Sequence, residues 1–250
     1  MVKEEELLAK RLIDLSRQAQ QKNIVVFSDF LNLNELNIFR QQSAEFYSGS
    51  ECFGGYGLSE RQMVAFLPDA LCYDWRFPIA CLKITPVNAR FAEALNHRDV
   101  LGSLMNLGLE RSRLGDILID GSLAYVFCHE KIAGYIAENL TRIRHTTVMA
   151  EPASLKDVQI GPKKEFAEGI ITSNRLDSIV ACICKVSRSQ ASQWIRGGRV
   201  FINSRETLQA TYVCKPQELI SVRSVGRFQF LGSTGETRKG RMKIQYEKYI

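Results

Sequence analysis

Apolar positions recur along the chain with two periods, and the change from one period to the other marks the expected elements. Residues 3–21 place Leu8, Leu12 and Leu15 on one face, with glutamates at the start, which predicts an amphipathic helix. The pattern then predicts a strand at 23–27, a helix at 31–39 and a hairpin of 45–49 with 61–68. We interpret residues 1–73 as an amino-terminal α+β unit.

The middle of the chain has the order strand, helix, strand, strand, helix, strand. These elements are predicted at 79–87, 97–108, 115–119, 122–128, 130–140 and 146–151. Asp120-Gly121 is a strong turn signal between the two central strands. The βαββαβ order predicts a ferredoxin-like, split-βαβ domain over 74–152, with both helices on one face of an antiparallel sheet.

The other face of that sheet has two possible uses. Tyr125 and Phe127 alternate on the third strand, as base-stacking aromatics do in RNA-recognition modules. The first strand offers only Ile79, Cys81 and Lys83 at the matching positions. Packing against a neighbouring domain is therefore favoured, and base stacking stays the alternative.

Polar residues 153–172 contain Gly161-Pro162 and are predicted to be a connector. Beyond them, an apolar stripe predicts a helix that begins after Arg175, and Ser187 with Gln190 indicates the capped start of a second helix. Two glycines end that helix, and the strand RVFIN follows.

Positive charge is concentrated in this last region. Residues 174–250 hold 14 Lys and Arg against five Asp and Glu, a net charge of +9, whereas the first 173 residues have a net charge of −3. The second helix and the following strand bring Arg188, Arg196, Arg199 and Arg205 close together. Guanidinium groups at such spacing repel one another, which favours an anionic partner such as a nucleic-acid backbone.

Several classes of protein fit the sequence poorly. No apolar run approaches the roughly 20 residues of a membrane span, and the amino terminus is an acidic helix rather than a signal peptide, so we expect a cytoplasmic protein. The three histidines, His97, His129 and His145, belong to no nucleophile or zinc motif. We therefore predict no catalytic residue, metal, cofactor or small-molecule substrate.

The run R-L-D…S-R-S-x-A…I-x-x-G-x-V-x-I-N resembles the S4 RNA-binding domain and covers about residues 173–221. The segments FGGYGLSERQ at 53–62, HRDVLGSLMNLGLERSRLGDILI at 97–119 and the tail at 220–244 extend the resemblance to the whole chain. Together they resemble the YlmH family of bacterial S4-domain proteins, which are often encoded near cell-division genes. The resemblance implies an α+β chain whose residues 173–250 form an S4 domain of the αL type with a basic extension.

The resemblance also implies RNA contacts at matching positions. These are Arg175, Ser187, Arg188, Ser189, Gln190, Arg196, Arg199 and Asn203. Charge and position alone add Arg205, Arg223, Arg227, Lys239 and Arg241. The implied partners are ribosomal RNA, tRNA and the 50S subunit, and the implied role is rescue of large subunits that retain peptidyl-tRNA.

Two other functions stay open. The family's gene neighbourhood suggests a structural partner at the division site. An RNA-modifying enzyme is suggested because pseudouridine synthases also carry S4 domains, with a catalytic aspartate in an R-L-D motif. Here Arg175 to Asp177 is the one such motif, and it already lies within the S4-like run, so this alternative is the weaker.

Overall fold

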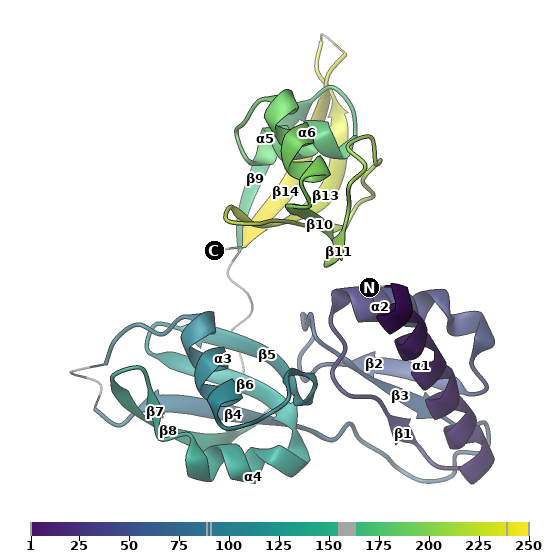
Figure 1. Ribbon diagram of the computed structural model, residues 1–250, viewed down its shortest axis with the longest axis vertical. Coiled ribbons are helices and arrows are strands. Elements are labelled where there is room, and N and C mark those ends of the chain that lie inside the picture. Colours follow the sequence, from purple (N-terminus) through teal and green to yellow (C-terminus); the bar gives the residue numbers. More distant parts are fainter. Residues whose placement is uncertain (1, 89, 91, 155–163, 239, 250) are drawn as a thin grey trace. The chain divides into compact units, whose positions relative to one another are not determined.

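A computed structural model describes residues 2–88, 90, 92–154, 164–238 and 240–249. The chain divides into two compact units, Met1–Gly161 and Pro162–Ile250 (Figure 1). Each unit has its own hydrophobic core. The first unit contains two antiparallel sheets and the second contains one, and helices cover one face of each sheet.

The first unit begins with a small helix and sheet layer. Its elements are α1 (Val2–Lys22), β1 (Val26–Phe27), α2 (Leu33–Gln41), η1 (Ser43–Glu45), β2 (Gly49–Phe53) and β3 (Met63–Leu67), with strand order β1-β3-β2. Leu12 is buried against this sheet with Leu8 and Leu15, as the period predicts. The prediction of a strand at 45–49 was wrong, because residues 43–45 form a 3-10 turn and Phe46 packs into the core.

The same unit continues with a five-stranded sheet. Its elements are β4 (Ile79–Pro86), α3 (His97–Asn106), η3 (Arg111–Arg113), β5 (Leu114–Asp120), β6 (Leu123–His129), α4 (Glu130–Asn139), β7 (Arg142–Ile143) and β8 (Thr146–Ala153). The strand order is β5-β6-β4-β8-β7. Apart from the two-residue β7, this is the predicted βαββαβ order, and α3 and α4 pack on one face through Val100, Leu104 and Ile136.

The opposite face carries Tyr125 and Phe127, and both are buried. They pack against Phe30 and Met63 of the amino-terminal part. Tyr56 stacks on the Phe127 ring with centroids 5.0 Å apart. These aromatics belong to an internal interface, so they are not available for base stacking.

The motif FGGYGLSERQ builds that interface. Gly55 has φ +103° and lies directly against the Phe127 ring, where a Cβ atom would clash. The Tyr56 hydroxyl donates to Asp116 at 2.8 Å, and the same carboxylate accepts from the main-chain N–H groups of Glu60 and Arg61. The two layers of the first unit are thus joined by hydrogen bonds as well as by apolar packing.

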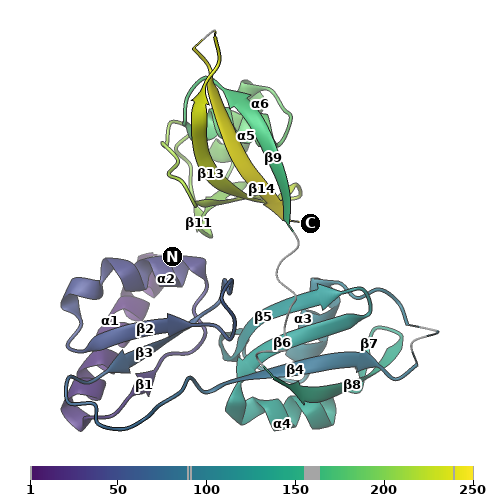
Figure 2. The same ribbon diagram turned by 180° about the vertical axis from the view of Figure 1, so that it is seen from behind.

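The second unit is a six-stranded sheet with two helices on one face (Figure 2). Its elements are β9 (Lys164–Ile171), α5 (Leu176–Ile183), α6 (Arg188–Arg196), β10 (Val200–Ile202), β11 (Arg205–Glu206), β12 (Leu219–Val222), β13 (Gly226–Glu236) and β14 (Met242–Tyr249), in strand order β11-β10-β12-β13-β14-β9. The connector predicted over 153–172 is shorter, because residues 164–171 pair with β14 as an edge strand. Residues 155–163 lie outside the described part of the chain.

Candidate nucleic-acid interface

The second unit holds two arginines against one buried carboxylate. Asp177, in the first turn of α5, has a side chain that is only 5% exposed. It accepts hydrogen bonds from Arg188 at 3.0 and 3.2 Å, and from Arg175 at 3.1 and 3.3 Å. The Arg188 and Arg175 side chains remain 48% and 39% exposed. Each guanidinium is therefore fixed by an internal partner and still presents an edge to solvent.

Burial by itself would raise the pKa of Asp177. The hydrogen bonds and charges of Arg188 and Arg175 outweigh that effect, so the pKa is lowered and the carboxylate is ionised at neutral pH. The mutual repulsion expected among the arginines is thus partly relieved inside the protein. Repulsion among the guanidinium groups is therefore not by itself a reason to expect an anionic ligand at Arg188.

A second pair of arginines lies on aromatic rings. The Arg199 guanidinium is 4.8 Å from the centre of the Trp194 ring, and Arg223 is 4.9 Å from that of Phe201. The Arg199 guanidinium donates to the main-chain oxygen of Arg223 at 3.2 Å, and the Arg223 main-chain N–H donates to that of Arg199 at 2.9 Å. Stacking on a ring holds a guanidinium in place without neutralising its charge.

The start of α6 is built as the sequence predicts. The Ser187 hydroxyl accepts from the Gln190 main-chain N–H at 3.2 Å and lies 3.0 Å from the Ser189 hydroxyl. All three side chains are exposed, as is Arg196 in the last turn of the helix. The helix therefore presents polar groups at its positive end and a cation at its negative end.

Asn203 has a structural role in the turn after β10. It adopts φ +49°, and its side-chain oxygen accepts from the Leu219 main-chain N–H at 2.9 Å. Arg205 on β11 and Arg227 on β13 are both exposed. The strand register places Arg227 on the same sheet face as Phe201, the ring that holds Arg223, whereas Arg205 lies opposite Ile202 on the other face, at the edge of the sheet.

Arg241 does not belong to this group. It lies in the turn between β13 and β14, beside the Glu236–Met242 pair, whereas Arg227 is at the opposite end of β13. Nine residues of strand separate the two ends, which corresponds to about 30 Å. Lys239 lies outside the described residues.

The supporting groups were missed when the sequence was considered alone. Asp177, Trp194 and Phe201 hold the arginines, yet the apolar pattern assigns Trp194 to the core and gives Asp177 no partner. The R-L-D spacing was the available signal for Asp177, because it places a carboxylate in the first turn of a buried helix. Contacts between α5 and α6 become visible only in three dimensions.

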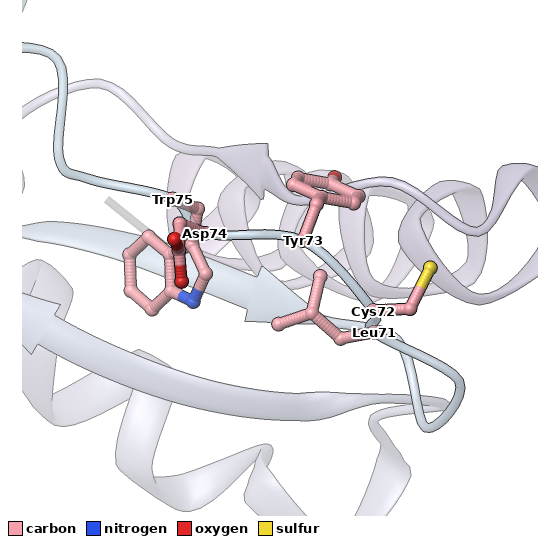
Figure 3. A pocket seen from close by; sticks show the side chains of 5 residues that line it. All are labelled: Leu71, Cys72, Tyr73, Asp74 and Trp75. Carbon is pink, nitrogen blue, oxygen red and sulfur yellow. The ribbon is translucent and has the colours of Figure 1, made fainter.

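Other features of the described residues point elsewhere. A hollow of about 520 Å³ in the first unit is lined by five consecutive residues, Leu71 to Trp75, and contains none of the predicted RNA contacts (Figure 3). The described residues contain no cluster of three metal-ligating side chains. Within the same residues, no helix has the length and apolar content needed to cross a membrane.

Three comparisons with known proteins bear on identity. A family model described as "Putative RNA-binding domain in YlmH" matches residues 74–157. The chain is 24% identical over 250 residues, 98% of its length, to the ribosome-associated protein quality control protein P2 of Bacillus subtilis (strain 168), and covers 96% of that protein. The solved structure of the cell division protein ylmH from Streptococcus pneumoniae matches with a TM-score of 0.52 and 20% identity, over 62% of this chain and 94% of that one.

The mixed α/β fold and the RNA-binding-domain match over the middle sheet indicate an RNA-binding protein. The family model and the relative agree with the resemblance carried by the motifs. The chain is therefore similar to the YlmH family.

Proposed function

We propose that this protein is a non-catalytic RNA-binding protein of the cytoplasm that associates with the large ribosomal subunit. In this proposal residues 173–250 form an S4 domain that contacts ribosomal RNA and tRNA, and the protein acts in the rescue of 50S subunits that retain peptidyl-tRNA. The name of the Bacillus subtilis relative supports a role at the ribosome. The family model supports RNA binding.

One observation carries the proposal. Arg188 is fixed by a bidentate contact to the buried Asp177 while about half of its side chain stays exposed. A guanidinium that is already oriented loses less rotamer entropy when it contacts a phosphate. Arg199, held on Trp194, offers a second fixed cation on the same unit.

Such an array suits phosphate contacts rather than base reading. Guanidinium edges recognise phosphate oxygens through paired hydrogen bonds. Contacts of this kind position a protein on a folded RNA without reading its sequence. We therefore expect strong salt dependence and a preference for structured RNA over a particular base sequence.

Sedimentation of tagged protein from cell lysate through sucrose gradients at low and high salt tests the proposal. We expect the wild-type chain to migrate with free 50S subunits at low salt, and to leave them at high salt or on substitution of Arg188→Ala or Arg199→Ala. Arg40→Ala, at an exposed arginine of the first unit outside the matched residues 74–157, is the control and is expected to stay bound. A chain that remains at the top of every gradient would contradict the proposal.

The solved relative's description as a cell division protein favours one other function, a structural role at the division site. Deletion of the whole second unit, residues 162–250, separates the two. A division phenotype that survives this deletion would favour the structural role, and one lost together with RNA binding would favour RNA as the primary ligand. An assay for uridine isomerisation that yields no product would remove the modifying-enzyme alternative.

A further inference from the structure

A pocket of about 330 Å³ lies in the second unit between the end of α5, the strands β9 and β14, and the turn that joins β12 to β13. Its volume is at the lower end of the range of about 300–1,000 Å³ that small-molecule sites occupy. It suits one ring system with its substituents, and it is too small for a helix or a folded partner.

The floor of this pocket is apolar and aromatic. Ile183, Phe228 and Tyr246 line it and are almost fully buried in the core. The two aromatic rings meet edge to face, with centroids 6.3 Å apart. Burial raises the pKa of the Cys184 thiol to about 11, so this part of the wall is uncharged at neutral pH. The floor therefore suits an uncharged planar group.

The rim of the pocket is cationic. Lys185 and Lys248 both line it and are exposed. Glu165 lies opposite Lys248 across the β9–β14 pair and offsets one of the two charges. The remaining positive charge favours an anionic substituent on the bound group, and the Glu165 carboxylate can accept a hydrogen bond from an exocyclic amine.

Lys185 adopts a backbone conformation that a lysine rarely has. Its φ is +54°, and the Val186 main-chain N–H donates to the oxygen of Ala181, which is the Schellman end of a helix where glycine is usual. A strained non-glycine residue suggests a role for its side chain. A cation also interacts favourably with the end of a helix, so a test must separate that role from ligand binding.

The pocket adjoins the proposed RNA surface. Val225 lines the pocket, and two arginines lie two residues to either side of it, Arg223 in the same turn and Arg227 at the start of β13. An RNA bound by these arginines would therefore lie near Val225 at the rim of the pocket. Single nucleotides that leave the stack of an RNA are bound on aromatic side chains in many RNA-binding proteins.

We propose that this pocket takes one unpaired nucleotide of the bound RNA, with its base on the floor of Ile183, Phe228 and Tyr246 and its phosphate between Lys185 and Lys248. This inference rests on the proposed RNA-binding function and adds a binding site to it. Glu165 makes an amine-bearing base such as adenine the better occupant.

Fluorescence anisotropy with the full chain and two labelled RNA hairpins of identical stem tests the proposal, one hairpin carrying a single bulged adenosine. We expect the wild-type chain to bind the bulged hairpin about tenfold more tightly, because the bulged base leaves water for a largely apolar pocket. Lys185→Gly removes the ammonium, and Ala167→Leu fills the pocket from its β9 wall. Each is expected to remove most of the preference and to leave the affinity for the paired hairpin unchanged.

The variants separate binding from folding. Lys185→Gly is expected to keep or raise the thermal midpoint, because glycine adopts a positive φ without strain. Lys243→Ala is the control, since this exposed lysine lies on β14 but faces away from the pocket, and it is expected to keep the preference.

Equal binding of both hairpins by the wild-type chain, or a preference that survives both substitutions, would overturn the proposal that the pocket binds a nucleotide. A preference lost only in Lys185→Gly would overturn insertion of the base. Absence of salt-sensitive binding to either hairpin would overturn the RNA-binding function itself, so the two failures are distinguishable.

Discussion

The two units use arginine in opposite ways. In the first unit, the Arg61 guanidinium donates to the main-chain oxygens of Phe30 and Leu114 at 2.9 Å and of Arg111 at 3.2 Å. Arg111 donates to the oxygens of Leu114 and Gly115 at 2.7 and 3.0 Å. Burial lowers the pKa of Arg111 to about 10, with the neighbouring Arg61 charge adding to the effect.

In the second unit, Arg188 and Arg199 have fewer internal partners and stay partly exposed. Arg188 is anchored by a carboxylate, and Arg199 by an aromatic ring. The number of internal hydrogen-bond acceptors therefore decides whether an arginine supports the fold or can bind a ligand. Main-chain oxygens that consume most of the five N–H donors make it part of the fold, whereas one anchor leaves donors for a ligand.

The largest effect is expected for Arg61→Ala. The main-chain oxygens of Phe30 and Arg111 lose this donor and that of Leu114 keeps only Arg111, so the free energy of unfolding of the first unit should fall by about 3 kcal/mol. Urea denaturation measures this change, and Arg76→Ala, at an exposed arginine, should cost less than about 0.5 kcal/mol. Equal costs for the two substitutions would contradict the assignment of Arg61 to the fold.

Asp177→Asn tests the carboxylate that anchors the arginines of the second unit. Loss of the charge at the arginine anchor should lower the free energy of unfolding of the second unit by about 1–3 kcal/mol and weaken RNA binding at the same time. A variant that binds RNA normally would show that the anchor does not orient Arg188 for its ligand.

The pH dependence of the same variant provides a second test. The pKa of Asp177 is lowered on folding, so its ionised form stabilises the protein above the unfolded pKa of about 3.9. That contribution is lost as the pH falls through the lowered pKa. The stability gap between the wild-type chain and Asp177→Asn should therefore narrow in acid. Thermal unfolding of both chains at pH 7 and at progressively lower pH measures this difference in stability. A difference that stays constant would contradict the prediction.

Arg199→Lys should have a smaller effect. The charge is kept, but the planar contact with Trp194 and the hydrogen bond to the Arg223 oxygen are weakened. We expect RNA affinity to fall by less than for Arg199→Ala, by about two- to fivefold, which corresponds to about 0.5–1 kcal/mol. Anisotropy titrations at fixed salt compare the two, and equal losses would show that stacking rather than charge is what matters.

The smallest effect is expected for Arg241→Ala. This residue lies about 30 Å along the β13–β14 hairpin from the arginine surface, so its contribution should be long-range and largely screened at physiological salt. Its substitution should change RNA affinity less than Arg223→Ala does. A larger loss for Arg241→Ala in parallel titrations would place the RNA on the hairpin tip instead.

Much of the fold could be predicted from the sequence because the apolar periods are long. The helices at 97–106 and 176–183 and the strands at 79–86 and 123–129 follow their patterns to within a few residues. β7 could not be predicted, because two residues carry no period. The edge strand β9 was taken for a connector, because its exposed face is mixed and its partner β14 is more than 70 residues away.

The candidate site was predictable in part for a different reason. The arginines of α6 and β10 are visible as a local cluster in the sequence. Their supports are not, because Asp177 reaches Arg188 across a helix pair and Phe201 reaches Arg223 across two strands. Asn203 stays a predicted RNA contact, and the turn in which its side-chain oxygen accepts a hydrogen bond could not be predicted from the sequence.

The most direct test of the central claim is the salt dependence of RNA affinity for the wild-type chain and Arg188→Ala. We expect log affinity to fall linearly with log salt concentration, and the slope to be shallower by about 0.7–0.9 in Arg188→Ala, which is the loss of one phosphate contact. Arg40→Ala, outside the matched residues 74–157, should keep the wild-type slope. A slope that is identical in the wild-type chain and Arg188→Ala would show that the surface anchored on Asp177 does not hold the RNA backbone.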